Sequence, residues 1–145
     1  MTANRQVALL INDFLYDKRG RIGDPCTYCG IVSDAYDHVP PLHYVSRLSS
    51  QEKHNIQLRK VPACHECNSA LSGNIDQSLV VRRKFVRNYL RKKYKKFLNM
   101  PKWDEDDLSE LADKLADHVR GASRHAEYIK SRLSFYGSWS TDQDH

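Results

Sequence analysis

The sequence predicts a small α+β domain held together by its cysteines, and three observations support this fold class. All four cysteines fall in two C-x-x-C pairs, Cys26 with Cys29 and Cys64 with Cys67, with 34 residues between the pairs. Two short segments with strand character lie beside these pairs. Amphipathic helical patterns fill the C-terminal half, and a length of 145 residues suits one domain with one modest core.

The cysteine spacing predicts a structural zinc site. Two C-x-x-C turns bring four thiolates to one point, and a closed shell of four sulfurs leaves no coordination position for chemistry. The alternatives are a redox C-x-x-C, for which one pair is sufficient, and a disulfide framework, which is typical of secreted chains. Because no cysteine is left over, we expect Zn²⁺ to be bound by Cys26, Cys29, Cys64 and Cys67.

Residues 23–75 are expected to form the core of a single domain that spans residues 1–145. In chain order, its expected elements are a strand within 31–39, a helical turn over 42–48, a polar loop over 49–55, a strand over 56–61 and a helix from about 64 to 71. Pro40 and Pro41 end the first strand because proline has no backbone N–H to donate. His65 and Glu66, inside the second cysteine turn, are expected to be solvated.

Helices are expected to flank this core on both sides. The apolar residues of 3–18 recur at helical spacing and predict an N-terminal helix within residues 1–22. Residues 76–136 form a helical extension: a basic helix over 76–98 with Asp76 as its N-cap, a helix of 104–120 that ends at Gly121, and a last helix over 122–136. The last two are expected to pack as an antiparallel pair, and residues 137–145 are expected to be a flexible tail.

Charge is segregated along the chain, whose formal net charge is +5. Residues 77–102 hold ten Lys/Arg and no acid, whereas 103–119 hold seven Asp/Glu and one Lys. A basic face binds phosphate and releases counterions, which predicts DNA as a partner. The candidate phosphate-binding residues are Arg59, Lys60, Arg82, Arg83, Arg87, Arg91 and Lys95.

The pattern predicts a cytoplasmic protein without a membrane span. No run of about 18 apolar residues is present, and the apolar stretch that begins at Val7 ends at Asn12, which is too early for a signal peptide. Paired C-x-x-C motifs without a secretion signal fit a reducing compartment.

Asp37 and His38 lie between the two cysteine pairs, and Asn68 directly follows the second; their side chains are of types that phosphodiester hydrolysis can use. Imidazole is a common general base near neutral pH, and carboxylate and amide oxygens are ligands that Mg²⁺ or Mn²⁺ accept. Adjacent residues of a strand point to opposite faces, so Asp37 and His38 share a site only if the strand bends or ends there. Pro40 and Pro41 are placed to produce that bend.

Taken in order, the first C-x-x-C pair, Tyr36-Asp37-His38-Val39-Pro40-Pro41 and Cys64-His65-Glu66-Cys67-Asn68 resemble the HNH endonucleases. The resemblance covers about a third of the chain, from about Cys26 to Gly73. It implies a ββα-metal fold in the variety braced by a four-cysteine zinc. It also implies that His38 is the general base and that Asp37 and Asn68 bind a catalytic Mg²⁺ or Mn²⁺.

One position of the family motif has no clear match. The family's middle Asn orients the general base, and the nearest candidate here is Asn55, which lies nine residues before Cys64. Arg59 occupies about the expected position. Three explanations stay open: Asn55 reaches the site from its loop, a backbone carbonyl orients His38, or the enzyme is impaired.

The sequence therefore predicts a metal-dependent HNH endonuclease that nicks or cuts DNA, with two alternatives. The first alternative is a catalytically inactive, zinc-stabilised module that binds nucleic acid. The second is an adaptor whose acidic helix, 104–119, binds a protein partner. A homodimer would be needed for one active site to cut both strands.

Overall fold

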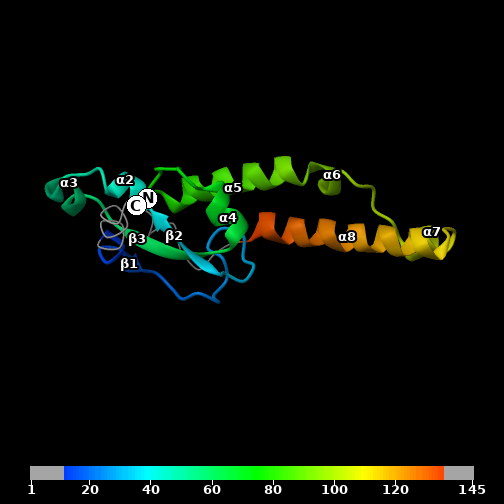
Figure 1. Ribbon diagram of the computed structural model, residues 1–145. Coiled ribbons are helices and arrows are strands. Elements are labelled where there is room, and N and C mark those ends of the chain that lie inside the picture. Colours follow the sequence, from blue (N-terminus) through cyan, green and yellow to red (C-terminus); the bar gives the residue numbers. More distant parts are fainter. Residues whose placement is uncertain (1–11, 136–145) are drawn as a thin grey trace, which may run out of the picture.

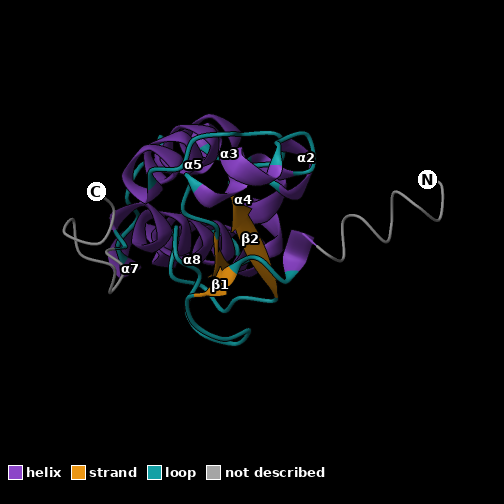
Figure 2. Cartoon of the chain, turned by 90° about the vertical axis from the view of Figure 1, so that its left-hand side faces the viewer, coloured by secondary structure: helices purple, strands orange, loops and turns teal. Residues whose placement is uncertain are grey.

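The computed structural model describes residues 12–135, and within them the chain is a mixed α+β protein with a small sheet and several helices (Figures 1 and 2). The elements are β1 (Asp17–Lys18), β2 (Ala35–Val39), α2 (Leu42–Val45), α3 (Ser50–His54), β3 (Arg59–Ala63), α4 (His65–Ala70), α5 (Leu79–Lys93), α6 (Lys95–Leu98), α7 (Glu105–Ser109) and α8 (Asp113–Ser134). Most of the expected N-terminal helix and all of the expected tail lie outside the described residues. No helix within 12–135 has the length and apolar composition needed to cross a membrane.

The sheet has the strand order β1-β3-β2. β2 and β3 are antiparallel, and their register pairs Asp37 with Val61 and His38 with Lys60. β1 runs parallel to β3. The last two residues of the helix expected over 3–18, Asp17 and Lys18, are therefore a strand, and that end of the prediction is wrong. The backbone N–H of Asp17 donates to Leu58 O at 2.9 Å, so these residues satisfy an edge of β3 that would otherwise lack a partner.

The main core lies where β2, β3, α4 and α5 meet. It contains the four cysteines together with Val39, Val61, Leu71, Val86 and Leu90, all of them buried. A smaller cluster of Tyr16, Val45 and Leu58 lies between the residues just before β1 and α2. The strand–strand–helix order around the cysteines is the one that the sequence predicted, with α2 and α3 inserted between the strands.

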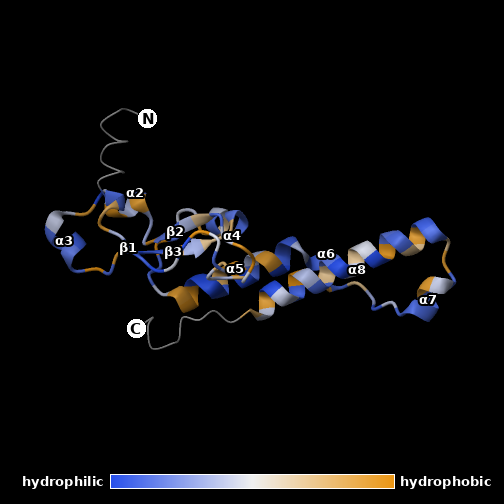
Figure 3. Cartoon of the chain, turned by 90° about the horizontal axis from the view of Figure 1, so that it is seen from below, coloured by the Kyte–Doolittle hydropathy of each residue, from blue (hydrophilic) through white to orange (hydrophobic). Residues whose placement is uncertain are grey.

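The C-terminal helices differ from the prediction. α8 is one helix of 22 residues that continues through Gly121, so the expected antiparallel pair of helices over 104–136 is wrong. α8 instead runs alongside α5 and α6, and α7 lies at the far end of this arm (Figures 1 and 3). Ala116, Ala126 and Ile129 are buried on one side of α8, and this packing outweighs the cost of about 1 kcal/mol of a glycine inside a helix. The acidic segment 104–119 becomes α7 and the start of α8.

Two shorter segments also differ from the prediction. The expected polar loop over 49–55 contains α3, which starts with a reciprocal cap: Ser49 Oγ accepts from Glu52 N, and Glu52 Oε1 accepts from Ser49 N, each at 3.2 Å. α5 begins later than expected because Ser78, and not Asp76, is its N-cap. It ends at Lys93, and Tyr94 separates it from α6.

Candidate active site and metal centre

The four cysteine sulfurs converge on one buried point. The Sγ atoms of Cys26, Cys29, Cys64 and Cys67 all lie within 4.8 Å of one another, and the Sγ atoms of Cys29 and Cys64 are 3.7 Å apart. Four sulfurs at roughly 2.3 Å from a tetrahedral Zn²⁺ would be separated by about 3.8 Å. The four cysteines are free thiols, so the cluster is not a disulfide framework. A redox C-x-x-C motif needs only one pair of cysteines, whereas here both pairs lie together. The geometry is that of a structural zinc site.

Local backbone structure brings each cysteine pair to this point. In the first turn, Gly30 N donates to Cys26 O at 2.9 Å, and Gly30 has a φ of +81°, a conformation that glycine adopts without strain. Cys64 is the N-cap of α4, and its Sγ accepts from Cys67 N at 3.4 Å. The four thiols shift one another's pKa in different directions. Contact with the Cys26 sulfur lowers the pKa of Cys29 to about 7, whereas contact with the other three sulfurs raises the pKa of Cys67. A thiolate is the form of cysteine that zinc binds.

Arg132 of α8 connects this cysteine cluster to the helical arm. Its side chain is 3% exposed, and Nη2 lies 3.8 Å from Cys64 Sγ and 4.0 Å from Cys67 Sγ. Nη1 donates to Glu66 Oε1 at 2.6 Å. A guanidinium next to the sulfurs offsets part of the negative charge that four thiolates place around a divalent ion.

Glu66 is the centre of a network that joins three helices, and the expectation that it is solvated is wrong. Besides Arg132 of α8, its carboxylate accepts from Lys93 Nζ of α5 at 2.5 Å and from the Tyr94 hydroxyl at 2.6 Å. Burial raises the pKa of Glu66, but these three hydrogen bonds outweigh burial and hold the pKa at about 2. Nothing in the sequence around Glu66 indicates these distant partners.

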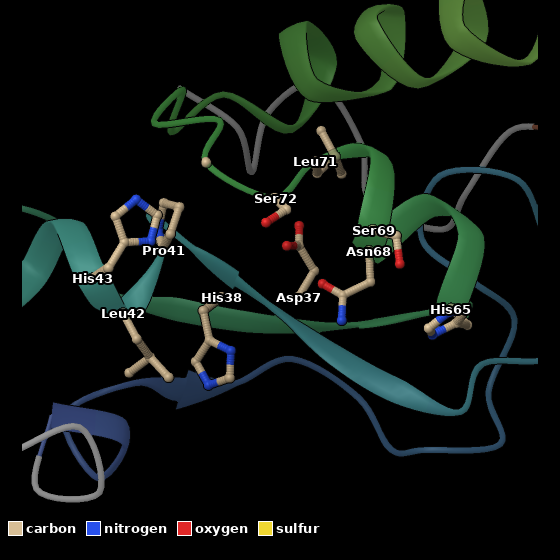
Figure 4. Close-up of a pocket in the computed structure, with 11 residues that line it drawn as sticks. Asp37, His38, Pro41, Leu42, His43, His65, Asn68, Ser69, Leu71 and Ser72 are labelled. Carbon is tan, nitrogen blue, oxygen red and sulfur yellow. The ribbon is translucent and has the colours of Figure 1, made fainter. Parts of the chain in front are cut away.

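A cavity of about 510 Å³ lies next to the cysteine cluster, between the end of β2 and α4 (Figure 4). Its lining contains all three residues singled out for chemistry. It is formed by Asp37, His38, Pro41, Leu42, His43, His65, Asn68, Ser69, Leu71, Ser72 and Gly73. Among these, Asp37 and Asn68 lie close together on the side of β2 that faces α4, whereas His38 lies on the opposite side of the strand (Figure 4).

Asp37 is buried and paired. Its Oδ2 accepts from Arg82 Nη2 at 2.7 Å and from the Tyr28 hydroxyl at 2.5 Å, whereas Oδ1 accepts from Arg82 Nη2 at 2.9 Å. Burial raises the pKa of Asp37, opposed by the charge of Arg82. A carboxylate oxygen has two lone pairs, so Oδ1 keeps acceptor capacity for a cation. Asp37 Oδ1 and the Asn68 amide oxygen are hard donors of the type that Mg²⁺ or Mn²⁺ accepts.

His38 has a different set of partners. Its Nε2 lies 2.6 Å from Asp13 Oδ1, and the Tyr16 ring packs edge-on against the imidazole with 4.8 Å between ring centroids. Lys60, across from His38 on β3, donates to both oxygens of Asp13 at 3.1 and 3.2 Å. The sequence analysis did not identify Asp13, because nothing local relates it to a strand that begins more than twenty residues later.

Asn55 does not reach His38. It is exposed at the C-terminal end of α3 and is absent from the lining of the cavity. Of the three explanations left open, the one in which Asn55 reaches His38 from its loop does not agree with this position, and the side chain that lies against the imidazole is Asp13. His43 and His65 also line the cavity. His65 is exposed, as the sequence predicted.

Four of the predicted phosphate-binding residues are buried and have structural partners. Arg59 donates to Gln77 O, Lys60 to Asp13 and Arg82 to Asp37, and Arg83 is 6% exposed. Their assignment to a DNA-binding face is corrected. Arg87 is half-buried, and Arg91 and Lys95 are exposed, as are their neighbours Lys84, Lys92 and Lys96.

No protein-family model, curated protein or solved structure matches this chain.

Zinc and folding should be inseparable in this protein. Replacing Cys26 or Cys64 by Ser should remove one zinc per chain and unfold the core, because metal binding and folding are thermodynamically linked. Elemental analysis of zinc content and circular dichroism would measure both effects. A cysteine variant that remains folded without zinc would contradict the structural role of the site.

Arg132→Met should destabilise the protein by about 3 kcal/mol, because it leaves part of a buried charge network without its cation. Arg120→Met is the matched control, since Arg120 lies on the same helix and forms exposed ion pairs with Glu105 and Asp117 at 3.3 Å. Exposed pairs contribute about 0–1 kcal/mol. Urea unfolding would measure the free energy of unfolding of both variants. Equal losses would show that Arg132 stabilises the protein no more than an exposed arginine does.

Proposed function

We propose that this protein is a metal-dependent endonuclease that hydrolyses DNA phosphodiester bonds, and that the cavity between β2 and α4 is its active site. One observation carries the proposal: Asp37, His38 and Asn68, from two separate elements, line a single cavity beside the four-cysteine centre. The same arrangement of strand, strand, helix and cysteines supports a ββα-metal core of the HNH type.

In this proposal each of the three residues has a separate task. Asp37 Oδ1 and the Asn68 amide oxygen would hold Mg²⁺ or Mn²⁺, which when bound supplies a Lewis acid for the phosphate and the leaving oxygen. His38 accepts a proton from a water molecule, and the resulting hydroxide attacks phosphorus. The bond from phosphorus to the 3′ oxygen breaks, and that oxygen takes a proton from solvent.

The position of His38 sets a condition on the substrate. His38 lies on the other side of β2 from Asp37 and Asn68 (Figure 4). The scissile phosphate would therefore have to sit at the end of this strand, which is Val39. Pro41 and Leu42 form the lining there, so the backbone turns away and leaves both sides of the strand accessible from one cavity.

The exposed cations of α5 and α6 provide a path for the DNA backbone away from the cavity. α5 has 15 residues and is therefore about 22 Å long at 1.5 Å per residue. This length corresponds to about six nucleotides of one strand at 3.4 Å each. Arg91, Lys92, Lys95 and Lys96 would contact phosphates, which supplies affinity without sequence readout.

A second function is favoured by one observation. The Asp37 carboxylate is already occupied by Arg82 and Tyr28, and a metal ligand of an active nuclease would have to share it. A catalytically inactive nucleic-acid-binding module would retain the same fold, the same cysteines and the same basic helix.

A plasmid assay separates these functions. Purified wild-type protein should nick or cut supercoiled plasmid with Mg²⁺ or Mn²⁺, and EDTA should abolish cleavage. His38→Ala should lower kcat by about 10²- to 10⁴-fold, the usual contribution of a general base. His54→Ala is the control, because His54 is exposed and does not line the cavity. The nuclease proposal fails if wild type and His38→Ala leave the plasmid equally intact, and salt-sensitive binding without cleavage would support the inactive module.

Reversing two exposed charges should weaken DNA binding. The double variant Arg91→Glu with Lys95→Glu should lower affinity and reduce the slope of log K against log salt by about 2, since two phosphate contacts are lost. Lys114→Glu with Arg124→Glu makes the same change in net charge with exposed residues of α8. Fluorescence anisotropy at several salt concentrations would compare them, and identical slopes would assign the α5–α6 face to solvent.

A further inference from the structure

Asp13 and His38 form a pair whose geometry is fixed from several directions. His38 Nε2 lies 2.6 Å from Asp13 Oδ1. The Asp13 side chain is 34% exposed and that of His38 is 22% exposed. Lys60, 10% exposed, donates to both Asp13 oxygens. Lys60 Nζ also lies 5.2 Å from the centre of the Tyr36 ring. The Tyr36 ring therefore helps to hold the Lys60 ammonium, which in turn holds the Asp13 carboxylate.

The backbone before β1 positions Asp13 independently of His38. Leu15 N donates to Asn12 O at 3.0 Å and Tyr16 N to Asp13 O at 3.2 Å, so Asp13 lies in a helical turn. Asn12 is buried, and its Oδ1 accepts from Lys53 at 3.1 Å. At the other end of the turn the Tyr16 hydroxyl donates to Pro40 O, which ties this segment to the end of β2. Asp13 is therefore placed by contacts on both sides of it.

The chemistry of such a pair is specific. A neutral imidazole carries its proton on one nitrogen, and a carboxylate at Nε2 selects the form with Nε2 protonated and Nδ1 free to accept. When Nδ1 takes a proton from water, the ring becomes positively charged, and an adjacent carboxylate stabilises that charge. The hydrogen bond from His38 and the contacts from Lys60 lower the pKa of Asp13, which keeps it ionised.

We propose that Asp13 is the positioning residue of the general base: it orients His38, fixes its Nε2-protonated form and directs Nδ1 to the water that attacks the phosphate. This inference rests on the proposed nuclease function and deepens it. Asp13 performs the task for which the HNH motif uses its middle Asn, and the group is a carboxylate from a different segment of the chain.

Steady-state cleavage by Asp13 variants tests this role. Asp13→Asn should lower kcat by up to about 10⁴-fold, because an amide can select the wrong protonated nitrogen of His38. KM should stay near the wild-type value, since Asp13 is not among the residues that line the cavity. Asp13→Glu should restore part of kcat, since it returns a carboxylate. Asp17→Asn is the matched control: Asp17 lies four residues away and pairs with Arg19 on the surface, and this variant should cleave like wild type.

¹⁵N NMR of wild-type protein gives a measurement that needs neither cleavage nor a variant. At a pH where His38 is neutral, its proton should be on Nε2, and a proton on Nδ1 would overturn the proposal. The kinetic outcomes are equally distinct. If wild type leaves plasmid intact, the nuclease function itself fails; if wild type cuts and Asp13→Asn retains full kcat, the nuclease stands and the role of Asp13 is refuted.

Discussion

The convergence of four sulfurs on one point is the constraint on which the rest of this structure depends. The first cysteine turn precedes β2, and the second opens α4, so one ion would fix the relative position of the strand and the helix. Asp37 and Asn68 lie on that strand and that helix. Loss of the metal would separate them, because two short strands and a helix of six residues bury too little apolar surface to hold this geometry alone.

Buried charge pairs connect the two long helices to the elements that carry the cysteines. Arg132 reaches the sulfurs from α8, and Arg82 reaches Asp37 from α5, so each long helix contributes a buried arginine that pairs with an acid near the cysteines. Burying a charge costs several kcal/mol unless it is paired, and a buried pair adds little net stability compared with apolar residues. Each arginine joins its helix to the core through a specific acid, Arg82 through Asp37 and Arg132 through Glu66.

The parts of the fold that the sequence predicted are those encoded locally. The cysteine spacing, the two strands and α4 depend on neighbouring residues, and all four members of the buried cysteine cluster could be identified. α3 was also readable, because Ser49 and Glu52 form a capping box that was interpreted as loop. Gly121 was interpreted as a helix end because the packing of α8 on α5 and α6 is a non-local contact. The partners of Arg82 and Asp13 could not be predicted for the same reason. A run of basic residues does not reveal which of them are buried, and a carboxylate does not reveal which histidine it will contact.

The Arg82–Asp37 pair has a consequence for how the proposed site would bind its ligands. With Arg82 in place, Asp37 contributes almost no net negative charge to the cavity, so a divalent cation would be held weakly by the protein alone. A bound phosphodiester would supply the negative charge that the cavity lacks. The cation and DNA would therefore bind cooperatively, each raising the affinity for the other by the same factor. Under this arrangement the proposed site would be complete only when substrate is present, so His38 would have a phosphate next to the water from which it takes a proton.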